Sequence, residues 1–70
     1  MTNDAWATER AGFLAAAGLL SERAALAYDM ARQGGTKRDR ARWAERAECL
    51  QGEVERLVII ARERYPERPQ

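Results

Sequence analysis

The second half of the chain carries apolar residues whose spacing alternates between four and three positions. The residues on this stripe are Trp43, Ala47, Leu50, Val54, Leu57 and Ala61. A helix that packs lengthwise against another helix shows this heptad spacing. Charged residues flank the stripe, so we predict a helix with one buried side and a solvated remainder. The pattern constrains the architecture closely and says little about activity.

A matching stripe runs through the first half of the chain. Its members are Trp6, Phe13, Leu20 and Ala27 at seven-residue intervals, with Ala17, Ala24 and Ala31 between or after them. Gly12 and Gly18 each weaken a helix by about 1 kcal/mol relative to alanine. The segment Gly18–Ser21 is where this helix could break, with Ser21 capping a new segment. The heptad phase continues across that segment, which favours one continuous helix, and we attribute the glycines to close helix–helix approach.

Local signals set the expected ends of the two helices. Short polar side chains at Asn3 or Asp4 can cap the first helix, and the pair Gly34–Gly35 can end it. Thr36 can cap the second helix, with Asp39 at the position of its capping partner. The expected elements of this single domain, spanning 1–70, are a helix at about 4–32, a turn at 33–35, a helix at about 36–65 and a tail at 66–70.

A turn of two or three residues makes the helices antiparallel neighbours, so we predict an all-α helical hairpin. Folding about the glycines pairs positions whose numbers sum to about 69. The expected pairs are Trp43 with Ala24, Ala27 and Ala31, Leu50 with Leu20, Leu57 with Phe13, and Ala61 and Tyr65 with Trp6. A large residue then faces small ones at the turn end, and small Ala61 faces large Trp6 at the open end, which supports the register.

Two helices cover only one side of each other, and a domain of 70 residues has a marginal core. We therefore expect a homodimer that forms a four-helix bundle. The segment Leu57–Ala61 is apolar on all sides of its helix, which favours burial all round. The expected dimer interface consists of Leu14, Leu19, Val58, Ile59 and Ile60. The alternative is an incidental exposed isoleucine pair, since scattered exposed apolar residues are common.

Basic residues gather around the turn, and we name them the basic tip. They are Arg32, Lys37, Arg38, Arg40, Arg42 and Arg46. Arg38, Arg42 and Arg46 stack on one helix face, where like charges repel, close to a helix N-terminus that disfavours cations. Such a local conflict is a common mark of a functional surface, so we expect a partner-binding site here. The alternative is a solvated arginine-rich turn that reflects genome composition.

The chain lacks the side chains of most catalytic and metal sites. It contains no histidine and one cysteine, Cys49, and no phosphate-binding loop. We therefore expect no enzyme activity, metal or cofactor. The apolar run Phe13–Leu20 is too short to span a bilayer, and the single cysteine suits a reducing compartment, so we expect a cytoplasmic protein without a membrane partner.

The expected architecture resembles the small dimeric helical hairpins of the Rop type, which are antiparallel four-helix bundles that bind paired RNA loops. The resemblance covers architecture alone, so no site residue is carried over. Short helical proteins of this kind are often adaptors or inhibitors encoded by phages and other mobile elements. A net charge of +1 does not favour nucleic acid. Our leading hypothesis is a homodimeric module that binds an acidic protein surface; the alternatives are a Rop-like RNA-binding protein and a structural assembly subunit.

Overall fold

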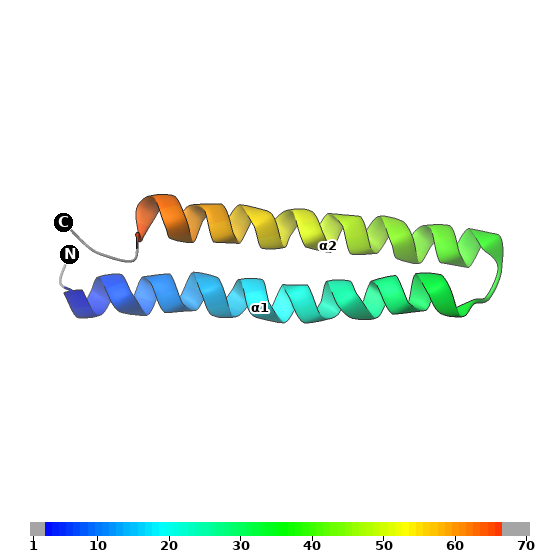
Figure 1. Cartoon of the computed structure of the whole chain (residues 1–70), viewed down its shortest axis with the longest axis horizontal. Helices are drawn as coiled ribbons and strands as arrows, with labels where there is room; N and C mark the ends of the chain where they lie inside the picture. Colours follow the sequence, from blue (N-terminus) through cyan, green and yellow to red (C-terminus); the bar gives the residue numbers. More distant parts are fainter. Residues whose placement is uncertain (1–2, 67–70) are drawn as a thin grey trace.

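The computed structural model describes residues 3–66 and consists of two long helices, α1 (Asn3–Gln33) and α2 (Lys37–Arg64). The helices lie side by side and run antiparallel, joined by a short turn at one end (Figure 1). The described residues form no strand. The predicted pair of packed helices is therefore confirmed, and α1 continues without a break through Gly18–Ser21. We call the end of the hairpin opposite the turn the open end.

Two glycines and one threonine reverse the chain between the helices. Gly34 and Gly35 have φ angles of +134° and +85°, which are strained for residues with a Cβ atom. A Cβ at Gly35 would also lie only 3.2 Å from Oδ2 of Asp39. The hydroxyl of Thr36 accepts a hydrogen bond of 3.1 Å from the backbone N–H of Asp39 and so caps α2.

The buried core of the hairpin consists of alanine side chains alone. Within the described residues, the fully buried apolar positions are Ala17, Ala24, Ala27, Ala47 and Ala61. All five belong to the two heptad stripes, which confirms the faces predicted to be buried. The larger stripe residues, such as Trp43 and Leu50, are half-buried. The two backbones are therefore joined through small side chains, with the large ones along the flanks of the contact.

The register agrees with the expected pairs Trp43 with Ala27 and Leu57 with Phe13, and it differs at Tyr65. Leu57 and Phe13 line one hollow together, as expected. Tyr65 stacks on Phe13 at 5.6 Å between ring centroids, whereas the simple register placed it beside Trp6. Tyr65 lies past the end of α2 with φ −130° and ψ 64°, so its side chain does not follow the helical register. The ring of Phe13 leans toward the N-terminus of α1, which lies at the open end, and so toward Tyr65.

The interior glycines of the two helices lie away from the helix contact. A Cβ atom built on Gly12, Gly18 or Gly52 would meet no neighbour within 4 Å. Our expectation that Gly12 and Gly18 mark close approach of the two helices is therefore wrong for a single chain. Each lies one position from a stripe residue, which turns it about 100° away from the partner helix.

Candidate functional site

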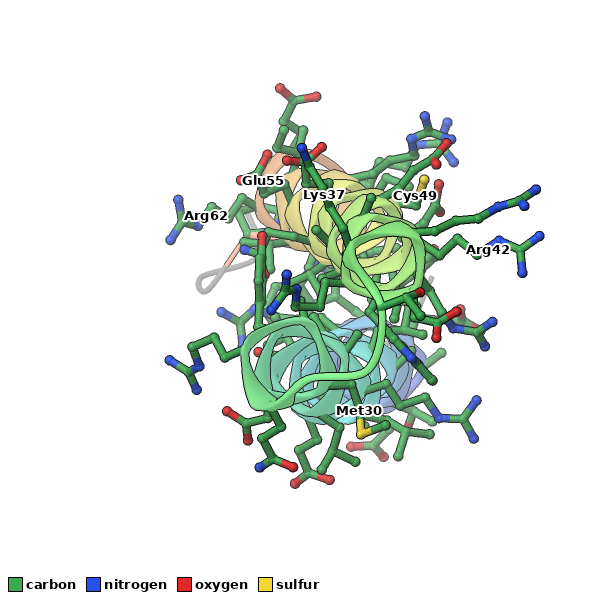
Figure 2. The ribbon with its side chains drawn as sticks, turned by 90° about the vertical axis from the view of Figure 1, so that its right-hand side faces the viewer. Met30, Lys37, Arg42, Cys49, Glu55 and Arg62 are labelled. Carbon is green, nitrogen blue, oxygen red and sulfur yellow. The ribbon has the colours of Figure 1, made fainter. Side chains whose placement is uncertain are left out.

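All six residues of the basic tip are exposed, and five of them lie on the first turns of α2. Figure 2 views the molecule from the turn and shows Lys37 and Arg42 extending from α2 in different directions. Arg62, near the other end of α2, points to the side opposite Arg42 (Figure 2). A partner can therefore reach the positive charge of the basic tip from several sides.

Ion pairing divides the basic tip into two parts. Arg32 forms a salt bridge with Asp29 of its own helix. The other salt bridge within residues 3–66 joins Arg56 and Glu53, at 3.4 Å, and lies outside the tip. The five tip residues on α2 thus form no salt bridge in the described part of the chain, and they supply the unpaired positive charge of the tip.

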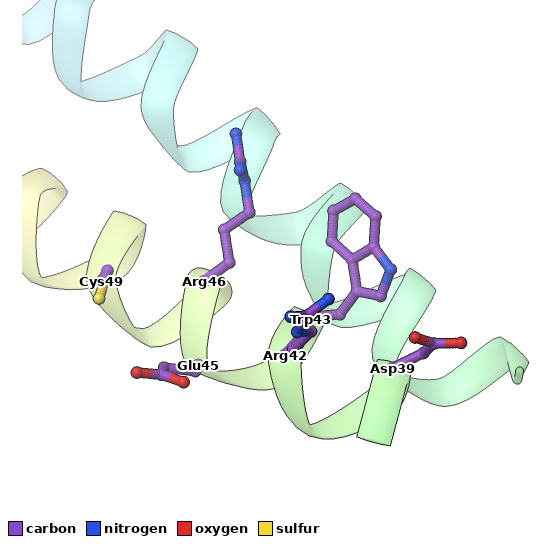
Figure 3. Close-up of a pocket in the computed structure, with 6 residues that line it drawn as sticks. All are labelled: Asp39, Arg42, Trp43, Glu45, Arg46 and Cys49. Atoms are coloured by element: carbon purple, nitrogen blue, oxygen red, sulfur yellow. The ribbon is translucent and has the colours of Figure 1, made fainter. Parts of the chain in front are cut away.

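A shallow groove of about 520 Å³ lies on α2 within the basic tip (Figure 3). Its lining residues are Asp39, Arg42, Trp43, Glu45, Arg46 and Cys49. We call it the Trp43 groove. Helical spacing brings these side chains together, and Figure 3 shows the indole of Trp43 extending toward α1. Trp43 is half-buried, so part of its ring is available to a partner.

A second hollow, of about 470 Å³, lies between the helices next to the Trp43 groove. Its lining residues are Arg23, Leu26, Ala27, Asp29, Met30 and Gln33 of α1 with Trp43, Arg46 and Leu50 of α2. Trp43 and Arg46 line both hollows, so the two depressions adjoin. Periodicity did not predict this hollow, because Trp43 was expected in the core and Leu26 and Met30 lie off the stripe that packs on α2.

The five residues expected at a dimer interface lie on several sides of the hairpin. Leu19 and Ile59 are exposed, with 54% and 52% of their surface accessible to solvent. Leu14, Val58 and Ile60 are half-buried. Leu14 and Leu19 are five positions apart on one helix, which separates their directions by about 140°. Consecutive residues 58–60 differ by about 100° each, so the five do not share one face.

Arg10 occupies a position on the heptad stripe of α1 that we did not predict from the sequence. It lies four residues after Trp6 and three before Phe13, which continues the heptad spacing. Its side chain is half-buried, and its Nε atom is buried without a hydrogen-bond partner. Arginine can occupy such a position because its long stem is apolar. Its presence places a charged residue in the helix contact near the open end.

Neither helix in residues 3–66 has a segment long and apolar enough to cross a membrane. The same residues contain no group of three or more metal-binding side chains that could hold one ion. No family model matches the chain, and neither a curated protein nor a solved structure shows significant similarity to it.

Proposed function

We propose that this chain is a non-enzymatic interaction module, an adaptor or inhibitor that acts as a homodimer and binds an acidic protein surface through its basic tip. The observation that carries the proposal is the half-buried Trp43 in a groove lined by Arg42 and Arg46. Tryptophan and arginine are the residues most enriched among the energetic centres of protein interfaces. A shallow groove of this kind suits a side chain or helix of a partner.

The charges of the Trp43 groove favour a protein over a nucleic acid. Asp39 and Glu45 line the same groove as the arginines. A phosphate backbone that followed the groove would meet these carboxylates, whereas a protein partner can place basic or polar groups beside them. Carboxylates on that partner would in turn pair with the arginines, which no acidic residue engages within the described chain.

An RNA-binding function is the second candidate, and one observation favours it. Trp43 adjoins Arg42 and Arg46, and aromatic rings next to arginines are the usual platform for unpaired bases. The two candidates differ in salt dependence, because each neutralised phosphate releases a condensed counterion. A purely structural assembly subunit would need no unpaired charge at the tip.

The test compares two triple variants with the same change in net charge. The first replaces Arg38, Arg42 and Arg46 with glutamine and neutralises the tip. The control replaces Arg56, Arg62 and Arg64 with glutamine at the other end of α2. Each tagged protein is used to capture partners from the native host for mass spectrometry, and is titrated with labelled RNA hairpins and DNA duplexes at about 50 mM salt.

We expect the control variant and the wild type to capture the same acidic protein and the tip variant to lose it. We also expect weak or no nucleic-acid binding by any of the three. Equal capture by all three proteins would contradict the proposed role of the tip. Micromolar RNA binding that the tip variant alone loses would replace the protein partner with the RNA alternative.

A further inference from the structure

The helix α1 carries a second heptad stripe that α2 does not cover. Its residues are Gly12, Ala16, Leu19, Arg23, Leu26 and Met30, spaced by four and three positions. Three of them are large and exposed: Leu19 at 54%, Leu26 at 65% and Met30 at 43%. The stripe of α1 that includes Phe13, Ala17 and Ala24 already packs on α2. The second stripe shows the same heptad spacing of a packed helix, but it has no partner within the chain.

The second stripe borders hollows along one long side of the hairpin. Leu26 and Met30 line the hollow between the helices that also includes Leu50. Nearer the open end, Gly12 and Ala16 line another hollow of about 390 Å³. Large side chains thus protrude in the half next to the turn, and small ones leave space in the half next to the open end.

The exposed surface of the hairpin is larger than that of a compact monomer. The chain exposes 5632 Å², and its Cα trace measures 52 × 15 × 13 Å. A compact protein of 7.9 kDa exposes about 4,400 Å², so the excess is about 1,200 Å². A standard interface buries about 800 Å² on each partner. The hairpin therefore has enough surplus surface for a stable dimer.

We propose that the second stripe of α1 packs against the same stripe of a second copy, antiparallel, with the two-fold axis at Leu19. This inference rests on the self-association included in the proposed function. The partner is a second copy because the stripe, which lies on α1 alone, is complementary to itself. A two-fold axis brings its protruding half, with Leu26 and Met30, onto its hollow half, with Gly12 and Ala16. Two chains related in this way would carry their Trp43 grooves at opposite ends of the bundle.

The axis at Leu19 matches side chains of complementary size. Residues equally far from Leu19 on either side face each other across such an axis. Leu26 of one chain then lies over Gly12 of the other, and Met30 lies over Thr8. Leu19 meets its own copy at the centre. The glycine at position 12, for which the single chain offers no packing reason, becomes the site that admits a leucine.

Arg23 is the charged residue on this stripe, and the same symmetry gives it a small neighbour. It faces Ala15 of the second chain, which leaves room for its stem while the guanidinium reaches solvent. A bulky residue at position 15 would instead collide with the stem. The stripe therefore tolerates its one charge without burying it.

The first experiment compares Leu19→Glu with Ile59→Glu by sedimentation equilibrium, with circular dichroism to verify the helices. Both positions are exposed to nearly the same extent in the single chain, so each variant should keep the hairpin fold. We expect a wild-type dimer and an Ile59→Glu dimer. In the Leu19→Glu dimer two carboxylates would face each other without partners, so its dissociation constant should rise by about a hundredfold or more.

The second experiment locates the axis by thiol cross-linking in a Cys49→Ser background. A cysteine at position 19 would lie near its own copy, so a bridging reagent with about 8 Å of reach should couple the chains. A cysteine at position 26 would lie about 21 Å from its own copy along the helices and should remain uncoupled. The two variants serve as controls for each other.

Each outcome has a separate meaning. A monomeric wild type at micromolar concentration would overturn both this interface and the homodimer of the proposed function. A wild-type dimer that Ile59→Glu dissociates and Leu19→Glu does not would leave self-association standing and overturn this interface. Cross-linking at position 26 and not at position 19 would overturn the antiparallel axis at Leu19.

Discussion

Phe13 and Tyr65 stack near the open end of the hairpin, with their ring planes inclined by 28°. Tyr65 follows the last residue of α2, and its backbone N–H still donates to the carbonyl of Ala61. The stack therefore fastens the end of α2 to α1 in the half of the hairpin away from the turn. It closes the hairpin at the end where no covalent connection does so.

We predict that Tyr65→Ala lowers the free energy of unfolding by about 1–2 kcal/mol, because it removes an aromatic pair and part of its buried area. Tyr65→Phe should remain close to the wild type, since the ring and the stack persist. Urea unfolding followed by circular dichroism measures both. Equal destabilisation by the two variants would show that the hydroxyl, and not the stack, holds the end.

Trp43→Ala should cost about 2 kcal/mol, less than the 3–5 kcal/mol typical of an aromatic ring deep in a core. The reason is that Trp43 is half-buried and borders two hollows. Urea unfolding gives the change in stability. Fluorescence measured in the Trp6→Phe background isolates the emission of Trp43, which should lie between that of a buried and that of a hydrated indole. A neutral truncation with fully hydrated emission would contradict the placement of Trp43 against Ala27 of α1.

Adjacent alanines provide a matched test of the alanine core. Ala24 is 1% exposed, whereas Ala25 is exposed to solvent. Ala24→Leu should destabilise the hairpin by about 1–3 kcal/mol, because the extra carbons must push the helices apart. Ala25→Leu should change stability by less than about 0.5 kcal/mol. Thermal unfolding of both variants checks this, and similar melting temperatures would refute close helix contact at Ala24.

Replacing Gly18 or Gly52 with alanine should stabilise the protein by up to about 1 kcal/mol each, because alanine is the better helix former. The structure offers open space for either Cβ atom. The positions are on different helices and share no neighbour, so the double variant should show the sum of both effects. Denaturant midpoints measure the gain, and a loss of stability in either single variant would reveal a neighbour that the hairpin alone does not contain.

The sequence predicted those parts of the fold that depend on periodicity. Heptad spacing identified the buried alanines because a residue such as Ala24 or Ala47 faces the partner helix by position alone. Periodicity could not place Tyr65, since the residue lies past the end of α2 with a non-helical backbone and stacks on Phe13. The Trp43 groove was also missed: a stripe position indicates which way a residue faces, and the size of the neighbouring alanines determines how much of a large ring remains exposed.

The interior built from alanine has a thermodynamic consequence. The heat capacity change of unfolding grows with the apolar area that unfolding exposes, and burying alanine hides little such area. Alanine also has no side-chain rotamers to lose. Folding therefore buries little apolar area and costs little side-chain entropy at these positions. The curve of stability against temperature should therefore be shallow for one isolated hairpin. A broad calorimetric transition and a small heat capacity change of unfolding would be the signature of this interior.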